Sequence, residues 1–189
     1  ITTATDTITL ATFTDSGCTT TPIATTINSS TQAASAGIAT FTTTDIETAG
    51  TYYIKASTGA LTLDCTAVAT VIDPAAAASL AFTATDDGAF VAGAAIAPAV
   101  EQLDTFGNTT ATTDTITITA FTENTCTTGA SPTMNGDSEA LSAGTLTFSG
   151  FNIETIGTYF LKVDDGSFSA CSGTTLDYVI SPAAASQLV

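Results

Sequence analysis

Hydrophobic and polar residues alternate along much of this chain of 189 residues. Residues 115–119 read TITIT and residues 159–163 read YFLKV, so apolar side chains recur at every second position. A period of two residues is typical of β-strands that bury one face and expose the other. Nothing has the longer period of a long amphipathic helix, and the pattern therefore predicts an all-β protein.

Stretches rich in Asp, Gly, Asn and Pro separate the alternating runs at the short intervals expected of hairpins. They lie at residues 86–88, 106–108, 131–137 and 164–166. The pattern predicts strands near residues 79–85, 96–103, 114–121, 144–150, 157–164 and 174–180, with a further short strand at 168–171. Six or seven short strands in roughly 108 residues are typical of a β-sandwich.

The chain contains two copies of one sequence pattern. Residues 45–57, DIETAGTYYIKAS, return as NIETIGTYFLKVD at residues 152–164, 107 positions later. The other matched pairs are 6–13 with 114–121, 36–41 with 143–148, 71–77 with 179–185, Cys18 with Cys126, and Cys65 with Cys171. Repeats of about 108 residues have the size of domains with their own cores, unlike the shorter units of solenoids.

The repeat predicts a first module at residues 1–74, a complete second module at 75–181, and a linker with the first strand of a following module at 182–189. The first module has no counterpart to residues 82–108, so it lacks its first two strands, and we expect one side of its core to be uncovered. The chain begins at Ile1 with neither an initiator Met nor a signal peptide, and we expect it to be a processed or excised part of a longer protein.

The tail PAAASQLV repeats the linker and first strand of a module that does not follow. Because the first module lacks its first strands, the two ends look complementary. We expect the tail to pack against the first module of a neighbouring copy, as strand addition or as a cut in a longer continuous chain, so that copies run head to tail. The residues expected at this polymer contact are Ala183, Ala184, Ala185, Ser186, Gln187, Leu188 and Val189.

Two short motifs carry a resemblance to a known family. They are DTFGN at residues 104–108 and IETxGTY, which occurs at residues 46–52 and 153–159. Across its whole length the chain resembles the bacterial and archaeal immunoglobulin-like (Big-type) repeats that are strung in tandem along large extracellular surface or filament proteins. The resemblance implies Greek-key, immunoglobulin-like β-sandwich modules. The chain departs from the family in its cysteines, which most such repeats lack.

Tyr52 and Tyr159 match the tyrosine-corner residue of immunoglobulin-like folds. The match implies that both are largely buried, and the alternation then directs Tyr53 and Phe160 outward. A slip of one residue in register would reverse this parity.

Charge is strongly one-sided, with 18 acidic residues against two lysines and a net charge of −16. Such a surface repels phosphate backbones and anionic lipid, which excludes nucleic acid as a partner. The longest apolar run, residues 89–100, is too short to span a bilayer and contains Gly and Pro. We therefore expect no membrane insertion.

Equivalent positions in equivalent folds are expected to share a partner. We therefore expect one disulfide in each module, Cys18 with Cys65 and Cys126 with Cys171. Paired cysteines in a threonine-rich chain of exported character are typically oxidised. Reduced thiols and links between chains stay open as alternatives, whereas a zinc site would need four convergent ligands and finds neither a His nor a CxxC motif.

Residue types that carry catalysis are scarce. The chain has no His, which excludes His-based triads and acid–base pairs, and it has no GxSxG, P-loop or dinucleotide motif. Residues 15–17 read DSG, as in half of an aspartic-protease site, but the matched residues 123–125 read ENT. A polar turn is therefore expected there, and we predict no enzyme activity, no cofactor and no metal site.

Lys55 and Lys162 occupy matched positions. An isopeptide cross-link would need a buried lysine, and the alternation faces both side chains to solvent, so we expect an exposed ion pair or contact residue. The Asp pairs at residues 86–87 and 164–165 fit turn chemistry. Calcium at a module junction is the weaker alternative, because no EF-hand or RTX spacing is present.

Threonines form rows on one side of matched strands. The rows are Thr7 and Thr9 in the first copy and Thr115, Thr117 and Thr119 in the second. We favour ordinary β-propensity on a solvated face; an O-glycan carrier, a contact face in a fibre, and an ice- or mineral-binding array are the alternatives. Sequons at Asn28 and Asn108 predict N-glycosylation, so glycans are candidate partners.

These features favour a structural extracellular protein, whose tandem modules form a filament or cell-surface stalk through head-to-tail association of copies of the same chain. The alternative is an adhesin that binds a glycan or protein ligand through its loops. Aromatic residues on loops would favour the adhesin, but Phe and Tyr lie mainly in the expected strands.

Overall fold

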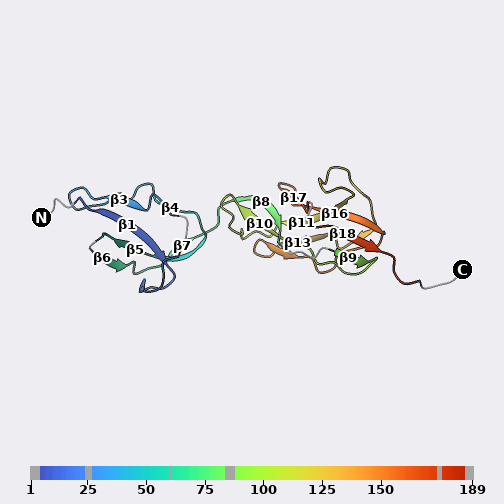
Figure 1. Cartoon of the computed structure of the whole chain (residues 1–189), viewed down its shortest axis with the longest axis horizontal. Helices are drawn as coiled ribbons and strands as arrows, with labels where there is room; N and C mark the ends of the chain where they lie inside the picture. The colour runs from blue at the N-terminus through green and yellow to red at the C-terminus, as the bar shows by residue number, and fades with distance from the viewer. Residues whose placement is uncertain (1–4, 24–26, 60, 84–87, 174–175, 186–189) are drawn as a thin grey trace. The chain divides into compact units, whose positions relative to one another are not determined.

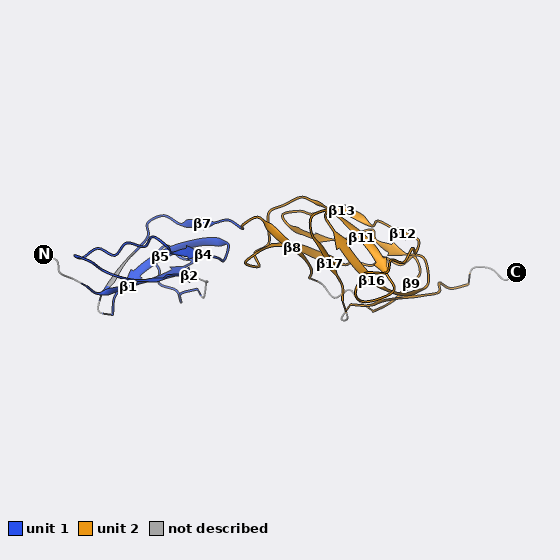
Figure 2. Cartoon of the chain, turned by 90° about the horizontal axis from the view of Figure 1, so that it is seen from above, with its two compact units in different colours: residues 1–74 blue, residues 75–189 orange. Residues whose placement is uncertain are grey.

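The computed structural model describes residues 5–23, 27–59, 61–83, 88–173 and 176–185. Within these ranges the protein is all-β and contains no helix, as the alternation predicts. The chain divides into two compact units, Ile1–Pro74 and Ala75–Val189, which Figure 2 shows in blue and orange. We call them unit 1 and unit 2 and describe each by itself.

Unit 2 folds into a sandwich-like pair of sheets (Figure 1). Its strands are β8 (Ala77–Phe82), β9 (Gly88–Val91), β10 (Ala99–Asp104), β11 (Thr115–Phe121), β12 (Met134–Asn135), β13 (Ser138–Ala140), β14 (Thr145–Thr147), β15 (Asn152–Ile153), β16 (Gly157–Asp164), β17 (Ser169–Cys171) and β18 (Tyr178–Ser181). One sheet has the order β14-β10-β8, and the other has the order β13-β11-β16-β18-β9 with β17 also paired to β16. The pairing of β9 with β18 is parallel, and β12 pairs separately with β15.

The core of unit 2 draws on both sheets. Strand β11 alternates buried isoleucines with exposed threonines, and β16 buries every second residue from Tyr159 to Val163. One apolar cluster joins side chains of the first sheet (Leu80, Val100, Leu146) to side chains of the second (Ile116, Ile118, Leu161, Val163, Tyr178, Ile180). The two sheets therefore pack face to face.

Unit 1 is built around a single main sheet. Its strands are β1 (Thr7–Phe13), β2 (Ile27–Asn28), β3 (Thr31–Ala33), β4 (Asp45–Ile46), β5 (Gly50–Ser57), β6 (Thr62–Cys65) and β7 (Thr70–Ile72). The sheet has the order β3-β1-β5-β6 with β7 also paired to β5, and β2 pairs with β4 outside it. This arrangement matches the second sheet of unit 2 without β9.

The register of the matched strands is the same in both units. Thr9 pairs with Ser57 in unit 1, and the matched Thr117 pairs with Asp164 in unit 2. The hairpin turn before β14 in unit 2 also has its match in unit 1, since Ala36 and Ala143 both adopt positive φ angles, of 51° and 50°. The matched sequences thus give matched backbones.

The expected strand list for the second module is incomplete. It omits β9, β12, β13 and β15, and part of the interval expected to be a turn, residues 131–137, forms the short strand β12. These strands are two to four residues long, too short for an alternating pattern to be recognised. The expected strand at 174–180 begins at Tyr178, and residues 174–175 lie outside the described part of the chain.

Tyr52 and Tyr159 are buried, with 5% and 6% of their surface exposed, as predicted. Their hydroxyls donate hydrogen bonds of 3.2 Å to the carbonyl oxygens of Ala49 and Ile156, three residues upstream. The first residue of each G-T-Y corner is glycine because the tyrosine side chain folds back over it. A Cβ added at Gly157 would lie 2.9 Å from the Tyr159 hydroxyl oxygen.

Tyr53 and Phe160 are half-buried, so they are less exposed than the alternation predicts. Each pairs across the strands with another aromatic residue, Phe13 and Phe121 respectively. Directly opposed residues lie on the same face of a sheet, so each phenylalanine covers part of its neighbour.

Gly144 provides a test of the turn before β14. Its φ is +77°, and an added Cβ would lie 1.8 Å from the carbonyl oxygen of Thr110. We expect Gly144→Ala to destabilise unit 2 by about 2–5 kcal/mol, because a left-handed backbone and a steric clash add together. Gly107→Ala is the control, since its φ is +85° with no atom within 4 Å of an added Cβ. It should cost only about 1–2 kcal/mol in urea unfolding, and equal losses would contradict the clash.

Candidate assembly surface

Each unit contains one disulfide. Cys18 is bonded to Cys65 and Cys126 to Cys171, with Cα–Cα distances of 5.7 and 5.9 Å. These are the pairings that the repeat predicts. Each bond ties the loop after the first matched strand (β1 or β11) to the last residue of β6 or β17.

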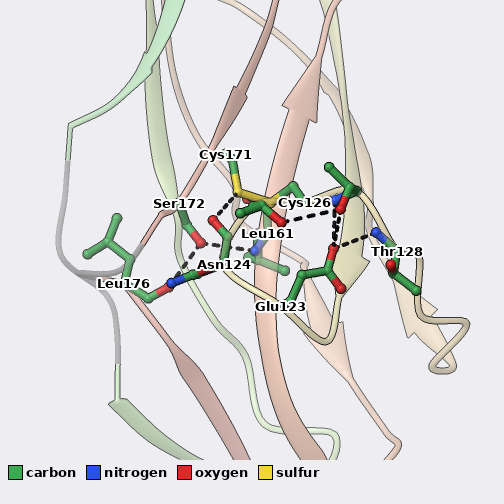
Figure 3. The surroundings of a disulfide bond; sticks show 10 residues. Glu123, Asn124, Cys126, Thr128, Leu161, Cys171, Ser172 and Leu176 are labelled. Atoms are coloured by element: carbon green, nitrogen blue, oxygen red, sulfur yellow. Dashed lines mark hydrogen bonds between the residues drawn. A yellow bond between two sulfur atoms is a disulfide. The ribbon is translucent and has the colours of Figure 1, made fainter.

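An acidic side chain anchors the turn beside each disulfide. Asp15 accepts hydrogen bonds from the backbone N–H and the hydroxyl of Thr19, both 2.9 Å, and from Thr20. Glu123 accepts the backbone N–H groups of Thr127 and Thr128 (Figure 3). These donors, led by the backbone N–H of Thr19 for Asp15 and of Thr128 for Glu123, lower the pKa of each carboxyl. The DSG triplet is therefore a polar turn, as expected.

A hydroxyl next to each disulfide forms a hydrogen bond to the neighbouring strand, β5 or β16, which the alternating pattern does not predict. In unit 2 the Ser172 hydroxyl accepts the N–H of Leu161 at 3.1 Å and donates to the carbonyl of Leu176 at 2.9 Å (Figure 3). In unit 1 the Thr66 hydroxyl accepts the N–H of Ile54 at 3.0 Å. The hydrogen bonds beside the two disulfides thus come from matched residues, Thr66 in unit 1 and Ser172 in unit 2.

Asp104 organises the DTFGN turn of unit 2. Its carboxylate accepts the backbone N–H groups of Ala75 (2.9 Å), Phe106 (2.8 Å) and Asn108 (2.9 Å), and the side-chain amide of Asn108 (2.8 Å). Burial raises the pKa of Asp104, but the donors, led by the Asn108 side chain, outweigh it and bring the pKa to about 2. The turn and the start of unit 2 therefore share one charged acceptor.

Acid should weaken unit 2 through Asp104. Its pKa is about 2 in the folded chain against an ordinary value of 3.8. A depressed carboxyl pKa stabilises the fold above the ordinary value, and the contribution is lost as the pH falls through the folded value. We expect the Tm of unit 2 to fall between about pH 4 and pH 2, and Asp104→Asn to lower the Tm at pH 7 while flattening this fall. An unchanged pH profile in the variant would show that Asp104 contributes nothing.

Gln102 is a second buried connection that sequence reasoning missed. Its side chain is 1% exposed, and its amide Nε2 donates to Asp165 at 2.7 Å and to Asp114 at 3.1 Å. Its Oε1 accepts the hydroxyls of Thr110 and Thr112. Gln102 therefore connects β10 to the loop at residues 110–114 and to the turn at Asp165. Nothing in an alternating pattern distinguishes it from an exposed polar residue.

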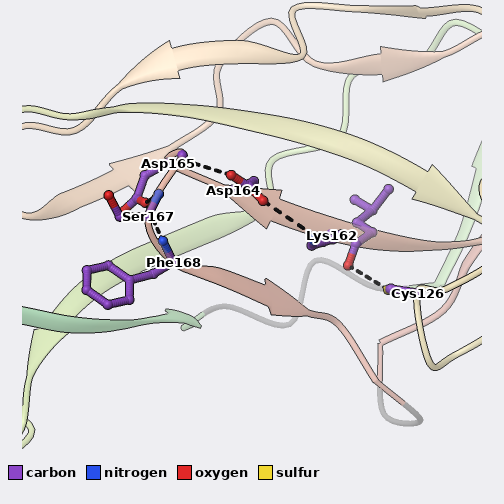
Figure 4. A network of polar contacts seen from close by, with 8 residues as sticks. Cys126, Lys162, Asp164, Asp165, Ser167 and Phe168 are labelled. Atoms are coloured by element: carbon purple, nitrogen blue, oxygen red, sulfur yellow. Dashed lines mark hydrogen bonds and ion pairs between the residues drawn. The ribbon is translucent and has the colours of Figure 1, made fainter.

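The acidic pair at residues 164–165 serves the turn between β16 and β17. Asp165 accepts the backbone N–H groups of Ser167 (2.8 Å) and Phe168 (2.7 Å), as Figure 4 shows. Burial raises the pKa of Asp165, but these donors and Gln102 lower it below its usual value.

No group of three or more His, Cys, Asp or Glu side chains in the described ranges could hold a metal ion. The other Asp pair, residues 86–87, lies outside the described residues.

The two lysines make different contacts. Lys162 forms an ion pair with Asp164 at 3.5 Å, with 33% and 44% of the two side chains exposed (Figure 4). Lys55 is half-buried, donates to the carbonyl of Cys18 at 3.5 Å and lies 5.9 Å from the ring centroid of Phe13. The ion pair expected from the alternation is present in unit 2, where both residues are half-buried, while Lys55 packs on its own disulfide loop.

Both sequon asparagines use their side-chain amides within the fold. Asn28 donates to Asp45 at 3.0 Å and to Glu47 at 2.7 Å, and it is exposed. Asn108 is half-buried and donates to Asp104. A glycan on Asn108 would disturb the Asp104 turn, so Asn28 is the more suitable of the two predicted sites.

The threonine rows face outward as expected, and every member is exposed. In unit 2 the row borders a shallow groove lined by Thr115, Thr117, Thr119, Phe121, Lys162, Asp164, Asp165 and Gly166. Hydroxyls, one aromatic ring and one ion pair are the groups that it offers to a ligand.

The apolar face of unit 1 is less completely covered than the matched face of unit 2. We call it the open face and define it by Ile8, Leu10, Phe41, Ile46, Ile54 and Ile72, all half-buried. The matched residues of unit 2 are Ile116, Ile118, Phe148, Ile153, Leu161 and Ile180, all between 0% and 3% exposed. The sheet β14-β10-β8 covers them in unit 2, whereas no strand in the described part of unit 1 corresponds to β8 or β10.

Residues 38–40 of unit 1, which match β14 of unit 2, also differ because the described part of unit 1 contains no counterpart of β10. Thr145–Thr147 forms strand β14 because it pairs with β10. The matched residues 38–40 form no strand, and Ile38 is 69% exposed. A segment with strand-forming sequence therefore stands beside the open face without the neighbour that it has in unit 2.

The expected contact tail is partly described. Ala183, Ala184 and Ala185 are exposed, and residues 186–189 lie outside the described ranges. In the portion of the chain that the structure describes, no helix has the length and apolar character needed to cross a membrane.

Comparison with protein-family models and with curated proteins finds no match. Among solved structures, the chain is similar to domains 4 and 5 of the S-layer protein SbsC, at 15% identity and a TM-score of 0.36, over 95% of this chain and 72% of that one. It is also similar to longer pieces of the surface layer protein SbsC, domains 4–9 (15% identity, TM-score 0.37, 97% of this chain) and domains 1–6 (14%, 0.37, 94%). The chain spans only 23% and 20% of the length of these two.

Proposed function

We propose that the chain is a structural extracellular protein, whose tandem immunoglobulin-like modules form a filament or cell-surface stalk by head-to-tail association. The observation that carries the proposal is the tandem repeat: unit 1 and unit 2 share one strand order and register, and each contains one disulfide at the matched positions.

The topology of unit 2 supports the immunoglobulin-like assignment. Strands β8, β10 and β14 take the places of A, B and E, and β11, β16 and β18 take those of C, F and G. Tyr159 begins the F-type strand and donates its hydroxyl back to Ile156, which is the geometry of a tyrosine corner.

Two disulfides, a surface rich in hydroxyls and a strong negative charge support an extracellular location. Disulfides persist in oxidising compartments, and a high net charge keeps a protein soluble. The only basic side chains are two lysines, which leaves few cleavage sites for trypsin-like proteases.

Electron microscopy and light scattering over a range of concentrations test the proposal. We expect end-to-end polymers of the full chain at high concentration, and their loss when residues 183–189 are deleted. Leu188→Asp keeps the chain at full length and should weaken association in the same direction. Protein that stays monomeric at millimolar concentration would contradict head-to-tail assembly.

The groove beside the threonine row favours the second candidate function, an adhesin. It combines hydroxyls with Phe121 and the Lys162–Asp164 pair, a set that suits a neutral saccharide. Binding of immobilised glycans that is lost in Thr117→Ala, by protein that forms no polymers, would favour the adhesin.

A further inference from the structure

We infer that unit 2 contains a site for an internal ester cross-link, in which the Thr112 hydroxyl replaces the side-chain nitrogen of Gln102 and ammonia is released. The inference goes beyond the proposed function and does not depend on it. An isopeptide bond would need a buried lysine, whereas Lys162 is partly exposed beside Asp164 and Lys55 packs on its disulfide loop. A hydroxyl can supply the nucleophile instead.

The side-chain carboxamide of Gln102 is the electrophile. Gln102 lies on β10 with 1% of its surface exposed, so water has little access to its Cδ. Its Oε1 lies 2.5 Å from the Thr112 hydroxyl and 3.0 Å from the Thr110 hydroxyl. A carbonyl carbon lies next to its oxygen, so a hydroxyl in this position is held close to the atom that it would attack.

The two hydroxyls have different roles. Thr110 is 3% exposed, and its hydroxyl also lies 3.1 Å from the backbone carbonyl oxygen of Gln102, which holds it in place. It can donate to Oε1 when negative charge develops there, at the distance of an oxyanion-hole donor. Thr112 makes the shorter contact with Oε1 and is half-buried. We therefore assign the nucleophile to Thr112 and the stabilising donor to Thr110.

Two carboxylates contact the nitrogen that leaves. The Nε2 of Gln102 donates to Asp165 at 2.7 Å and to Asp114 at 3.1 Å. A carboxylate can take the proton of a hydroxyl and return it to a departing nitrogen. Asp165 already accepts two backbone N–H groups in its own turn, whereas Asp114 is exposed and follows Thr112 by two residues. Asp114 is therefore the proton carrier.

The reaction needs no group from outside unit 2. The Thr112 Oγ1 attacks Cδ of Gln102 while Asp114 takes the hydroxyl proton, and a tetrahedral intermediate forms with its charge on Oε1. Asp114 then gives the same proton to Nε2, the carbon–nitrogen bond breaks, and ammonia leaves. An ester now joins Oγ1 to Cδ, and no electron is gained or lost. Ammonia is protonated in neutral water and diffuses away, which keeps the reverse reaction slow.

The ester ties β10 to the segment that leads into β11. The backbone N–H of Thr110 already donates to the carbonyl of Gln102 at 2.9 Å, so the two segments lie side by side before any reaction. The DTFGN turn lies between them in sequence. The cross-link therefore closes this turn covalently and keeps it closed when the sheets separate.

Mass spectrometry of the intact full chain tests the inference. We expect a mass lower than that of the disulfide-bonded sequence by one ammonia molecule. Peptide mapping should find residues 102 and 112 joined, and dilute alkali should open the ester and leave glutamate at position 102. Gln32 is the internal control, because it is exposed and its amide donates to the carbonyl of Ala33 at 3.4 Å. Gln32 should remain glutamine.

Four variants assign the roles. Thr112→Val removes the hydroxyl at nearly constant volume and should keep the ammonia, whereas Thr112→Ser should still lose it. In freshly synthesised protein, Thr110→Val and Asp114→Asn should each form the cross-link about 100-fold more slowly, the size of effect expected for a lost oxyanion donor or general base. A merely structural role for these residues would not change the rate at which ammonia is lost.

The mass of the unsubstituted chain decides the inference even where a variant fails to fold. A chain with the full mass of its sequence overturns it and leaves Gln102 as a hydrogen-bonding residue only. Loss of ammonia that persists in Thr112→Val also overturns it, because a succinimide at Asn135–Gly136 would give the same change in mass. Loss that maps to residues 102 and 112 and disappears in Thr112→Val supports the ester.

Discussion

Replacing Cys18 and Cys65 by serine should unfold unit 1, whereas the same change at Cys126 and Cys171 should leave unit 2 folded but weakened. The bonds span similar sequence separations, 47 and 45 residues, so each contributes about 4 kcal/mol on the chain-entropy model. Unit 2 also has a fully covered core, while the open face leaves unit 1 with little else. Loss of its disulfide should therefore unfold unit 1 but not unit 2.

Hydrogen exchange on the full chain reports the two units separately. The Cys18→Ser/Cys65→Ser variant should lose protection in β1 and β5 while the strands of unit 2 keep theirs. The Cys126→Ser/Cys171→Ser variant is the matched control and should lose about 2–5 kcal/mol in unit 2. If β1 and β5 stay protected without their disulfide, unit 1 has a stronger core than its exposure indicates.

The second large effect is expected at Leu161. This side chain is fully buried in the core of unit 2, and Leu161→Ala should destabilise the unit by about 2–5 kcal/mol. Ile54 is the matched residue of unit 1 and is half-buried. Ile54→Ala should cost less, about 1–3 kcal/mol, because part of the side chain is exposed to water in the native state and its burial contributes less transfer free energy.

Urea unfolding with exchange readout in each unit gives both values. Equal costs in the free chain would show that the open face is covered in solution by some other part of the protein.

The long strands and the disulfides were both predictable, each from a different feature of the sequence. Long strands such as β11 and β16 reveal themselves by alternation, and the duplicated pattern assigns the cysteine partners by position alone. Strand β12 was not predictable, because Met134 and Asn135 pair with β15 within a stretch rich in turn residues. A two-residue pairing depends on contacts distant in sequence.

The polar connections inside unit 2 lay beyond the sequence for a different reason. Gln102 and Asp104 fall on β10 and at its end, where the pattern treats them as ordinary polar residues. Their importance comes from the donors and acceptors that the fold brings to them, including Ala75 and Asp165. The open face was predictable from the missing segment, but its match to residues 38–40 required the pairing of β10 with β14.

The disulfides also set how far each unit can lengthen when the chain is pulled from its ends. Residues between the bonded cysteines cannot be drawn out, so the sequence separation of 45 from Cys126 to Cys171 withholds about 150 Å of contour length from an unfolding unit 2. The corresponding loop of unit 1 withholds a similar length. A filament of such units would stretch little and stiffen early, even after its sheets have come apart. Reduction of the disulfides would make the same filament extensible.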